Sequence, residues 1–191
     1  MTGPPEVLPD FCIGTERLVL RAWRDGDVAA FQHICSDPLV MTTLGPPLDL
    51  AQTAALVARM HGLQDTLGYC FWAVERRADA HLIGWCGVIR GSVGPVEGKA
   101  EIGWRLASDC WGQGYASEAA AATVGWCKEH LSDNAVWAIT SCDNHRSRAV
   151  MVRLGMSHRP ELDFAHPGLA ADDPLLAHVT YSLAFTGEMA R

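Results

Sequence analysis

Two glycines stand where a strand-like run passes into a helix-like run, and together they suit the binding of an anion. Gly112 and Gly114 follow an alternating stretch and precede an Ala-rich stretch with helical spacing. Glycine adopts backbone angles that other residues avoid, and it lets a ligand approach the main chain closely. The first N–H groups of a helix lack partners within it, and the macrodipole adds positive charge there. The turn is therefore a candidate pyrophosphate site, although an ordinary strand-to-helix turn would have the same composition.

Two familiar phosphate-binding motifs are absent from this region. The chain has no Gly-x-x-x-x-Gly-Lys-Ser/Thr sequence, so it contains no P-loop. The Gly-x-Gly-x-x-Gly pattern of dinucleotide-binding proteins fails because Ser117 takes the place of its third glycine. A phosphate site at this turn would thus consist of backbone N–H groups.

The elements that would position this turn follow from hydrophobic periodicity. Two helices are expected early in the chain, one after the cap at Asp25–Asp27 and one after the cap at Asp49. Two more are expected over 112–131 and 144–154, and Gly155 ends the last of them. Strands are expected over 16–23, 69–75, 82–89, 99–106, 135–142 and 177–185. Successive strands without a helix between them predict antiparallel pairing, and the later strand–helix–strand unit predicts one parallel step.

Length and composition favour one folded domain. The chain has 191 residues, of which 49% are apolar and 19% charged, which excludes a disordered or fibrous protein. We expect a lead-in over 1–14, a single domain over 15–186 and a short tail over 187–191. The formal net charge of -7 argues against nucleic acid or an anionic membrane as the main partner.

The chain shows no targeting segment and no metal-binding pattern. Residues 1–14 lack a basic region followed by an apolar run, and no stretch of about 18 apolar residues occurs. The seven cysteines include no Cys-x-x-Cys pair, so neither a disulfide framework nor a zinc site is indicated. We therefore expect a cytoplasmic protein with reduced cysteines, no membrane partner and no metal.

Three stretches of the sequence resemble one known family. The segment AEIGWRLASDCWGQGYASEA at 100–119 looks like the acetyl-CoA-binding signature of the GNAT N-acetyltransferases. The segments ITSCDNHRSRAVMVRLGM at 139–156 and TERLVLRAWRDGDVAAF at 15–31 are similar to the RimJ/RimL-like branch, the ribosomal-protein N-terminal acetyltransferase type. The resemblance implies an α/β fold with a central, mixed, mostly antiparallel sheet of about seven strands. That sheet would splay between its fourth and fifth strands and carry about four flanking helices.

The resemblance also implies where acetyl-CoA, the co-substrate, would bind. Its pantetheine arm would lie between the strands at 99–106 and 135–142, with backbone contacts at Leu106 and Ala107. Asn144 would hydrogen-bond the pantetheine, or cap the following helix, or do both. The pyrophosphate would accept hydrogen bonds from the backbone of Trp111, Gly112, Gln113, Gly114, Tyr115 and Ala116.

Glu101 is the candidate general base of the reaction that the resemblance implies. The reaction is direct attack of an amine on the acetyl thioester, and a protonated amine must first lose a proton. Glu101 lies in a strongly apolar run, where burial would raise its pKa toward neutrality. The structural alternative is that it faces solvent or pairs with Arg105. Glu118, in the second turn of its helix, is better explained as a structural residue.

The general acid is less clear from the sequence. Many family members carry a tyrosine where this chain has Met151, which cannot donate a proton. In the RimJ/RimL-like branch a serine three residues after the asparagine takes this role, so Ser147 is the candidate proton donor and a contact of the CoA sulfur. Its structural alternative is a hydrogen bond within the first turn of the helix. His166 is open to either a substrate contact or a packing role.

Two classes of function therefore remain at this point. The first is an acetyl-CoA-dependent N-acetyltransferase that acts on a protein N-terminus or a small amine. The alternative is a non-catalytic acyl-CoA-binding sensor or scaffold protein. A homodimer paired through an exposed last strand is a further expectation.

Overall fold

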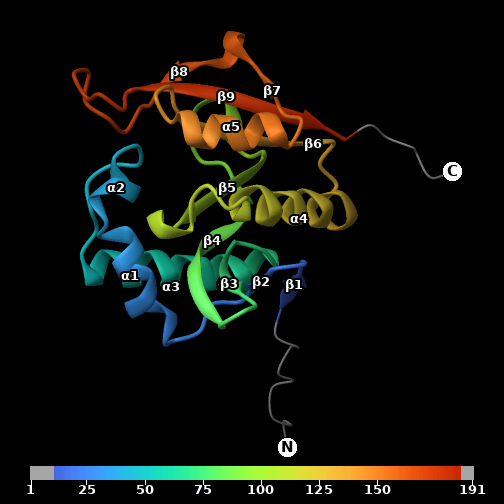
Figure 1. Ribbon diagram of the computed structural model, residues 1–191. Coiled ribbons are helices and arrows are strands. Elements are labelled where there is room, and N and C mark those ends of the chain that lie inside the picture. The colour runs from blue at the N-terminus through green and yellow to red at the C-terminus, as the bar shows by residue number, and fades with distance from the viewer. Residues whose placement is uncertain (1–10, 186–191) are drawn as a thin grey trace, which may run out of the picture.

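A computed structural model describes residues 11–185, which form one open sheet covered by helices (Figure 1). The sheet has nine strands in the order β1-β2-β3-β4-β5-β6-β9-β7, and β8 also pairs with β9. The strands are β1 (Cys12–Gly14), β2 (Leu18–Arg21), β3 (Phe71–Arg76), β4 (His81–Arg90), β5 (Ala100–Leu106), β6 (Ala135–Ser141), β7 (Ser157–His158), β8 (Phe164–Ala165) and β9 (Ala177–Ala184). The helices are α1 (Asp27–Cys35), α2 (Pro38–Met41), α3 (Leu50–Leu67), α4 (Tyr115–His130) and α5 (His145–Arg153).

The pairing confirms the expected mixed, mostly antiparallel sheet. Every pair is antiparallel except β5 with β6, which run parallel across the connection through α4. The sheet has more strands than expected because β1, β7 and β8 are too short to show an alternating pattern. β1 also extends the sheet into the region expected to be only a lead-in.

The loop expected between the first two long helices contains the extra helix, α2. Asp37 caps it by accepting a hydrogen bond from the Leu39 N–H at 2.8 Å, and Pro38 occupies its first turn. Proline there fixes a helical φ without losing a needed N–H. Pro38, which suggests a loop when the sequence is considered alone, therefore begins a helix.

The expected splay lies between β5 and β6. These strands share one paired position, Glu101 with Trp137, whereas β4 and β5 pair along the whole of β5. Beyond Glu101 the two strands separate, so their facing backbone groups are left without a partner strand. This gap is the structural feature on which the candidate site depends.

Helices cover both faces of the sheet. α4 packs on β2, β4 and β5, and α1 packs on β4 and on α3. The layer that contains α4 is separate from the layer formed by α1 and α3 (Figure 1). Side chains alternate between faces along a strand. Glu101, Gly103 and Arg105 therefore share one face, which is the α1 face because Arg105 contacts Cys35 of α1.

Local sequence signals place most helix ends. The Asp49 carboxylate accepts from the Gln52 N–H while the Gln52 side chain accepts from the Asp49 N–H, a complete capping box at the start of α3. Gly155, with φ of 79°, follows α5 and ends it. The expected cap at α1 differs: Gly26 occupies the cap position, and Asp27 forms a bidentate pair with Arg21 at 2.7 and 2.9 Å.

The last strand is not an open edge. β7 and β8 cover parts of its outer side, and between them the Thr180 N–H donates to Asp163 while its carbonyl accepts from the Arg159 N–H. This edge therefore offers little main chain to a second copy, and the structural basis for the expected strand-paired homodimer is lost. In the described part of the chain, no helix is long and apolar enough to cross a membrane.

Candidate active site

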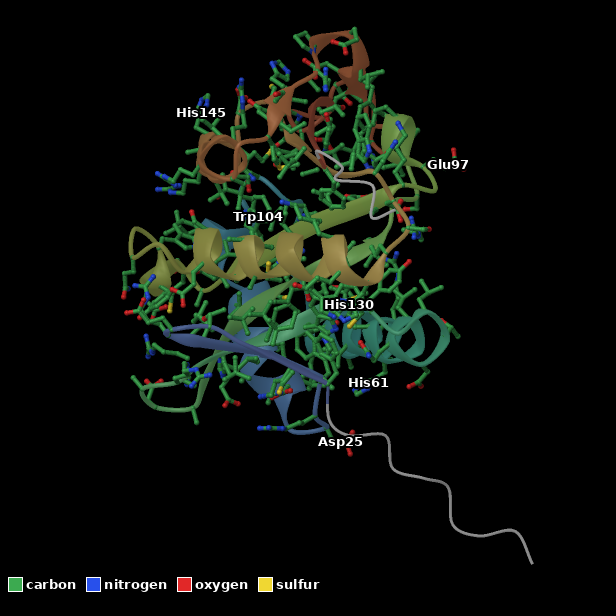
Figure 2. All side chains as sticks on the ribbon, turned by 90° about the vertical axis from the view of Figure 1, so that its right-hand side faces the viewer. Asp25, His61, Glu97, Trp104, His130 and His145 are labelled. Atoms are coloured by element: carbon green, nitrogen blue, oxygen red, sulfur yellow. The ribbon has the colours of Figure 1, made fainter. Side chains whose placement is uncertain are left out.

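A cleft of about 890 Å³ opens at the splay, between the glycine turn that precedes α4, helix α5 and helix α2. Figure 2 shows Trp104, which lines the cleft, between α4 and the helix that begins at His145. The cleft brings together residues predicted separately from the sequence. It is lined by Leu106, Trp111, Gly112, Gly114, Tyr115, Ala116, Asn144 and Ser147.

Two predicted contacts, Ala107 and Gln113, do not line the cleft. The Ala107 N–H donates to the Ile83 carbonyl at 2.9 Å, and its own carbonyl accepts from Cys110. The Gln113 side chain turns back to the Asp109 carbonyl at 3.0 Å. The backbone polar groups of Ala107 are thus already paired within the chain, and the Gln113 side chain points away from the cleft.

The glycine turn, residues 111–116, presents free N–H groups to the cleft. Gly112 and Gly114 have φ of 74° and 84°, in the left-handed region that favours glycine. Within residues 11–185, the N–H groups of Gly112, Gln113 and Gly114 have no backbone acceptor, whereas Trp111 donates to Ser108 at 3.2 Å. The first N–H groups of α4 add to this set. The turn can therefore bind an anion through its main chain, with Trp111 excluded as a backbone donor.

Basic side chains on α5 form the opposite wall, and the sequence reading missed them. His145, Arg146 and Arg153 line the cleft, and the Arg146 guanidinium lies 4.5 Å from the centre of the Trp111 ring. The signal was the run His145-Arg146-Ser147-Arg148, which places two arginines and a histidine in the first turn of a helix. The cleft is locally positive although the chain is acidic overall, which suits a phosphate-bearing ligand.

Glu118 holds the glycine turn from outside the cleft. Its carboxylate accepts from the Thr15 hydroxyl at 2.6 Å, from the Arg17 N–H at 2.8 Å and from the Arg17 guanidinium at 2.7 Å. Arg17 also donates to the Gln113 carbonyl at 2.9 Å and stacks on Tyr115. Burial tends to raise the pKa of Glu118, but the hydrogen bonds from Thr15 and Arg17 lower it below its ordinary value.

We expect Glu118→Ala to loosen the glycine turn. Hydrogen bonds to a charged group contribute roughly 1.5–3 kcal/mol each when they are shielded from water. Solvent lowers the contribution of an exposed pair such as Arg17 with Glu118 to roughly 1 kcal/mol or less. The variant should unfold at a lower temperature and bind acetyl-CoA several-fold more weakly, as thermal unfolding and calorimetric titration would measure. Glu129→Ala, an exposed change in the same helix, is the matched control. Equal behaviour of the two variants would contradict the bracing role.

Asn144 acts as a helix cap. Its side-chain oxygen accepts from the Ser147 N–H at 3.1 Å and its amide donates to the Thr140 hydroxyl at 2.9 Å. Asn144 is buried at the wall of the cleft. The capping role expected from sequence is therefore present, and the residue also lies where a ligand would pass.

A second, smaller pocket of about 150 Å³ adjoins the cleft and contains both candidate catalytic residues. The two cavities share Leu44, Trp104, Arg105 and Ser147 in their walls. Glu101 lines only the smaller pocket, together with aromatic and aliphatic side chains: Phe71, Trp85, Ile139 and Met151.

Glu101 is a half-buried carboxyl group that forms no ion pair with any residue the structure describes. Burial raises its pKa from 4.5 to about 7, and the charge of Arg59 opposes the shift only in part. Within residues 11–185, it makes no salt bridge, so the alternative of a pair with Arg105 does not hold. A carboxyl group with this pKa accepts and releases a proton near neutral pH.

Ser147 lies in the wall shared by the two cavities. Its N–H is used by the Asn144 cap, while its hydroxyl makes no hydrogen bond to any residue that the structure describes. Met151, where the sequence resemblance led us to look for a tyrosine, is buried against the same pocket and cannot donate a proton. Ser147 thus adds to this wall a hydroxyl group without a partner among residues 11–185.

His166 lies outside both cavities. Its ring packs against His178, with 4.9 Å between ring centres, and its Nδ1 accepts from the Gly168 N–H. Within the described range, no group of three or more His, Cys, Asp or Glu side chains could hold a metal ion.

Comparison with known proteins identifies the family. The sequence model described as Acetyltransferase (GNAT) domain matches residues 17–157, which include the glycine turn, Glu101 and α5. The chain belongs to the GNAT acetyltransferases. This membership confirms the resemblance seen in the sequence, and it means that the protein is an acetyltransferase.

Two relatives from Bacillus subtilis match about three quarters of this chain. The Bacillus subtilis protein YkkB is 29% identical over 145 residues, 75% of this chain and 84% of its own. The N-acetyltransferase YoaA of the same organism is 27% identical over 150 residues, 74% of this chain and 80% of its own.

Solved GNAT structures share the fold over nearly the whole chain. An acetyltransferase from Agrobacterium tumefaciens has a TM-score of 0.73 and 26% identity, covering 96% of this chain and 98% of its own. RimL, a ribosomal alpha-N-protein acetyltransferase solved with coenzyme A, has a TM-score of 0.74 and 18% identity, covering 92% of this chain and 98% of its own. At that identity the likeness to RimL concerns the fold.

Proposed function

We propose that this GNAT protein transfers the acetyl group of acetyl-CoA to a primary amine, and that Glu101 and Ser147 carry the proton transfers. One observation supports this above all: a carboxyl group with a pKa of about 7 and a free hydroxyl line one small apolar pocket beside a cleft with free backbone N–H groups. Acetyl-CoA supplies the activated acyl group as a thioester.

The cleft fits acetyl-CoA by charge and shape. The N–H groups of Gly112, Gly114, Tyr115 and Ala116 would bind the pyrophosphate. Arg146 and Arg153 would face its phosphates. The splay between β5 and β6, where Leu106 and Asn144 lie, would receive the pantetheine arm. This arrangement would direct the thioester end toward the smaller pocket.

The proton transfers follow from the two side chains in that pocket. Glu101 accepts a proton from the acceptor ammonium, directly or through a water molecule, and leaves a neutral amine that can attack the acetyl carbon. Ser147 donates a hydrogen bond to the departing sulfur. As the C–N bond forms and the C–S bond breaks, the attacking nitrogen gives up a proton, which the hydroxyl relays to the thiolate, so that the amide, the thiol of CoA and a neutral Ser147 result. Both groups lie in apolar surroundings, where such interactions are stronger than in water.

The acceptor is either a protein N-terminus or a small-molecule amine. The likeness of the fold to RimL favours an N-terminal amine. Leu39 of α2 and Leu44, which follows this helix, line the cleft. These exposed leucines could contact the first residues of a peptide.

A turnover screen tests the proposed function. The full chain is incubated with acetyl-CoA and a panel of amines and N-terminal peptides, and released CoA is measured. We expect turnover with at least one acceptor class and no CoA release above hydrolysis without an acceptor. Absence of turnover with every class would contradict the proposal.

We expect Ser147→Ala to lower kcat about 10- to 100-fold with little change in acetyl-CoA affinity, because the hydroxyl acts on the departing sulfur. Rates are compared at saturating acetyl-CoA, with affinity measured by calorimetry. Ser157→Ala, an exposed change in β7, serves as control. A kcat equal to that of the control would remove Ser147 from the mechanism.

A further inference from the structure

Arg105 places a positive charge in the smaller pocket. No carboxylate within residues 11–185 pairs with this charge. Arg105 lines both the cleft and the smaller pocket. Its guanidinium lies 5.0 Å from the centre of the Trp85 ring, and its Nη1 donates to the Cys35 sulfur at 3.1 Å. Burial keeps the pKa of the Cys35 thiol above its usual value, so this partner is neutral at physiological pH.

The guanidinium is also short of hydrogen-bond acceptors. Its Nε is shielded from solvent and has no partner, and between residues 11 and 185 no acceptor bonds the second terminal nitrogen. Arg21 pairs with Asp27 and Glu75, and Arg90 pairs with Asp133. Arg148 and Arg159 have no carboxylate partner, but they donate to carbonyl or hydroxyl oxygens. Among residues 11–185, Arg105 alone leaves a buried side-chain nitrogen without a partner, which is costly and calls for an external acceptor.

Glu101 does not serve as that partner. The two residues lie on the same face of β5, four positions apart, which separates their Cα atoms by about 13 Å. No ion pair joins them, and the cation that acts on the pKa of Glu101 is Arg59. The smaller pocket therefore contains a proton acceptor at one position and a separate, unpaired cation at another.

We propose that the acceptor carries a carboxylate beside its primary amine, and that Arg105 binds this carboxylate. The proposal rests on the proposed function, because it assigns the second polar group of the same pocket. Guanidinium matches carboxylate in both charge and planar geometry. Phe71 and Trp85 line the same pocket, and their apolar rings would lower the local dielectric and so strengthen the pair. The carboxylate has two sources, the α-carboxylate of a free amino acid or an acidic side chain at the start of a peptide.

Matched acceptors test the proposal. One pair consists of amino acids and their α-amides, and the other of peptide amides that begin with Asp or Asn. The measured quantity is the ratio of kcat/KM for the carboxylate member to that for the amide member. A charged hydrogen bond of about 1.5–3 kcal/mol corresponds to a ratio of roughly 10–150 in the wild type. Arg105→Met should bring the ratio close to one, and Arg105→Lys should restore part of it.

Arg24→Met is the charge-matched control, because Arg24 is largely exposed and lies outside both cavities; its ratio should equal that of the wild type. Thermal unfolding shows whether Arg105→Met is folded. A preference in the first pair identifies free amino acids, and one in the second identifies acidic N-termini. An active wild type without either preference overturns the proposal and leaves the proposed function standing.

A binding measurement decides the proposal independently of turnover. Protein saturated with CoA is titrated calorimetrically with the N-acetylated members of both pairs. Tighter binding of a carboxylate member by wild type, lost in Arg105→Met, supports the proposal. Equal binding of carboxylate and amide overturns it. A chain without turnover on any acceptor contradicts the proposed function alone, because this titration still reports on Arg105.

Discussion

Replacing Glu101 by glutamine is expected to lower kcat/KM about 100- to 1,000-fold, the size of effect typical of losing a general base. Acetyl-CoA should still bind, because Glu101 lies in the smaller pocket and not in the wall of the cleft. Glutamine keeps the size of the side chain but cannot take a proton. Steady-state rates and calorimetric titration of acetyl-CoA would separate the two effects.

The pH profile gives a second test of Glu101. Burial raises the pKa of this carboxyl group to about 7, and the base must be ionised to act. In the wild type kcat/KM should therefore rise with pH up to about 7 and then level off. The Gln variant should lose this limb of the profile. An unchanged limb in the variant would assign it to another group.

The same burial has a consequence for stability. The folded-state pKa of Glu101 lies above the ordinary value of 4.5, so the folded protein binds more protons than the unfolded chain between 4.5 and about 7. The neutral form of Glu101 makes its whole contribution to the free energy of unfolding at low pH. This contribution, roughly 3 kcal/mol, is lost as the pH rises through about 7. Glu101→Gln should thus raise the unfolding temperature at pH 8 and change it little at pH 5.

Glu97→Gln is the matched control for these measurements. Glu97 is exposed and lies on the far side of the molecule from His145 and the cleft (Figure 2). The substitution removes one carboxylate without touching either cavity, so rate, pH profile and stability should stay close to those of the wild type. A similar loss of activity in this variant would show that net charge, and not the position of Glu101, sets the rate.

Gly112→Ala and Gly114→Ala are each expected to weaken acetyl-CoA binding about 5- to 30-fold. Both residues have positive φ, which costs other residues roughly 1–2 kcal/mol, and 1.4 kcal/mol corresponds to a tenfold change in affinity. A Cβ at Gly112 would meet no atom within 4 Å, so the cost there comes from the backbone alone. The strained turn would relax and turn its N–H groups away from the phosphates. Calorimetric titration measures the change.

Gly125→Ala is the control for the glycine turn. Gly125 lies within α4, has ordinary helical geometry, and a Cβ there would also meet nothing within 4 Å. Alanine in a helix interior stabilises by roughly 0.5–1 kcal/mol relative to glycine, so this variant should unfold at a higher temperature and bind acetyl-CoA normally. Unchanged affinity in the Gly112 and Gly114 variants would show that the turn does not bind the phosphates.

The parts of the fold that sequence predicted well are those whose signals are local. The Asp49 and Asn144 caps, the end of α5 at Gly155 and the positive φ of Gly112 and Gly114 each depend on a few neighbouring residues. The family signature spans adjacent residues too. Short strands such as β7 and β8 escaped prediction because two residues cannot show a period, and their partner, β9, supplies their hydrogen bonds.

Residue type and spacing were enough to predict the order of the long helices and strands and the glycine turn, because these signals are local. The family resemblance added Glu101 and Ser147 as candidates. The three-dimensional packing was needed to show that Glu101 is largely shielded and, within residues 11–185, has no ion-pair partner, and that Arg105 contacts Cys35 and Trp85. It also decided that Glu118 braces a turn by way of residues more than a hundred positions away. Burial and long-range pairing depend on which strands and helices come together, and no local pattern of residues specifies that.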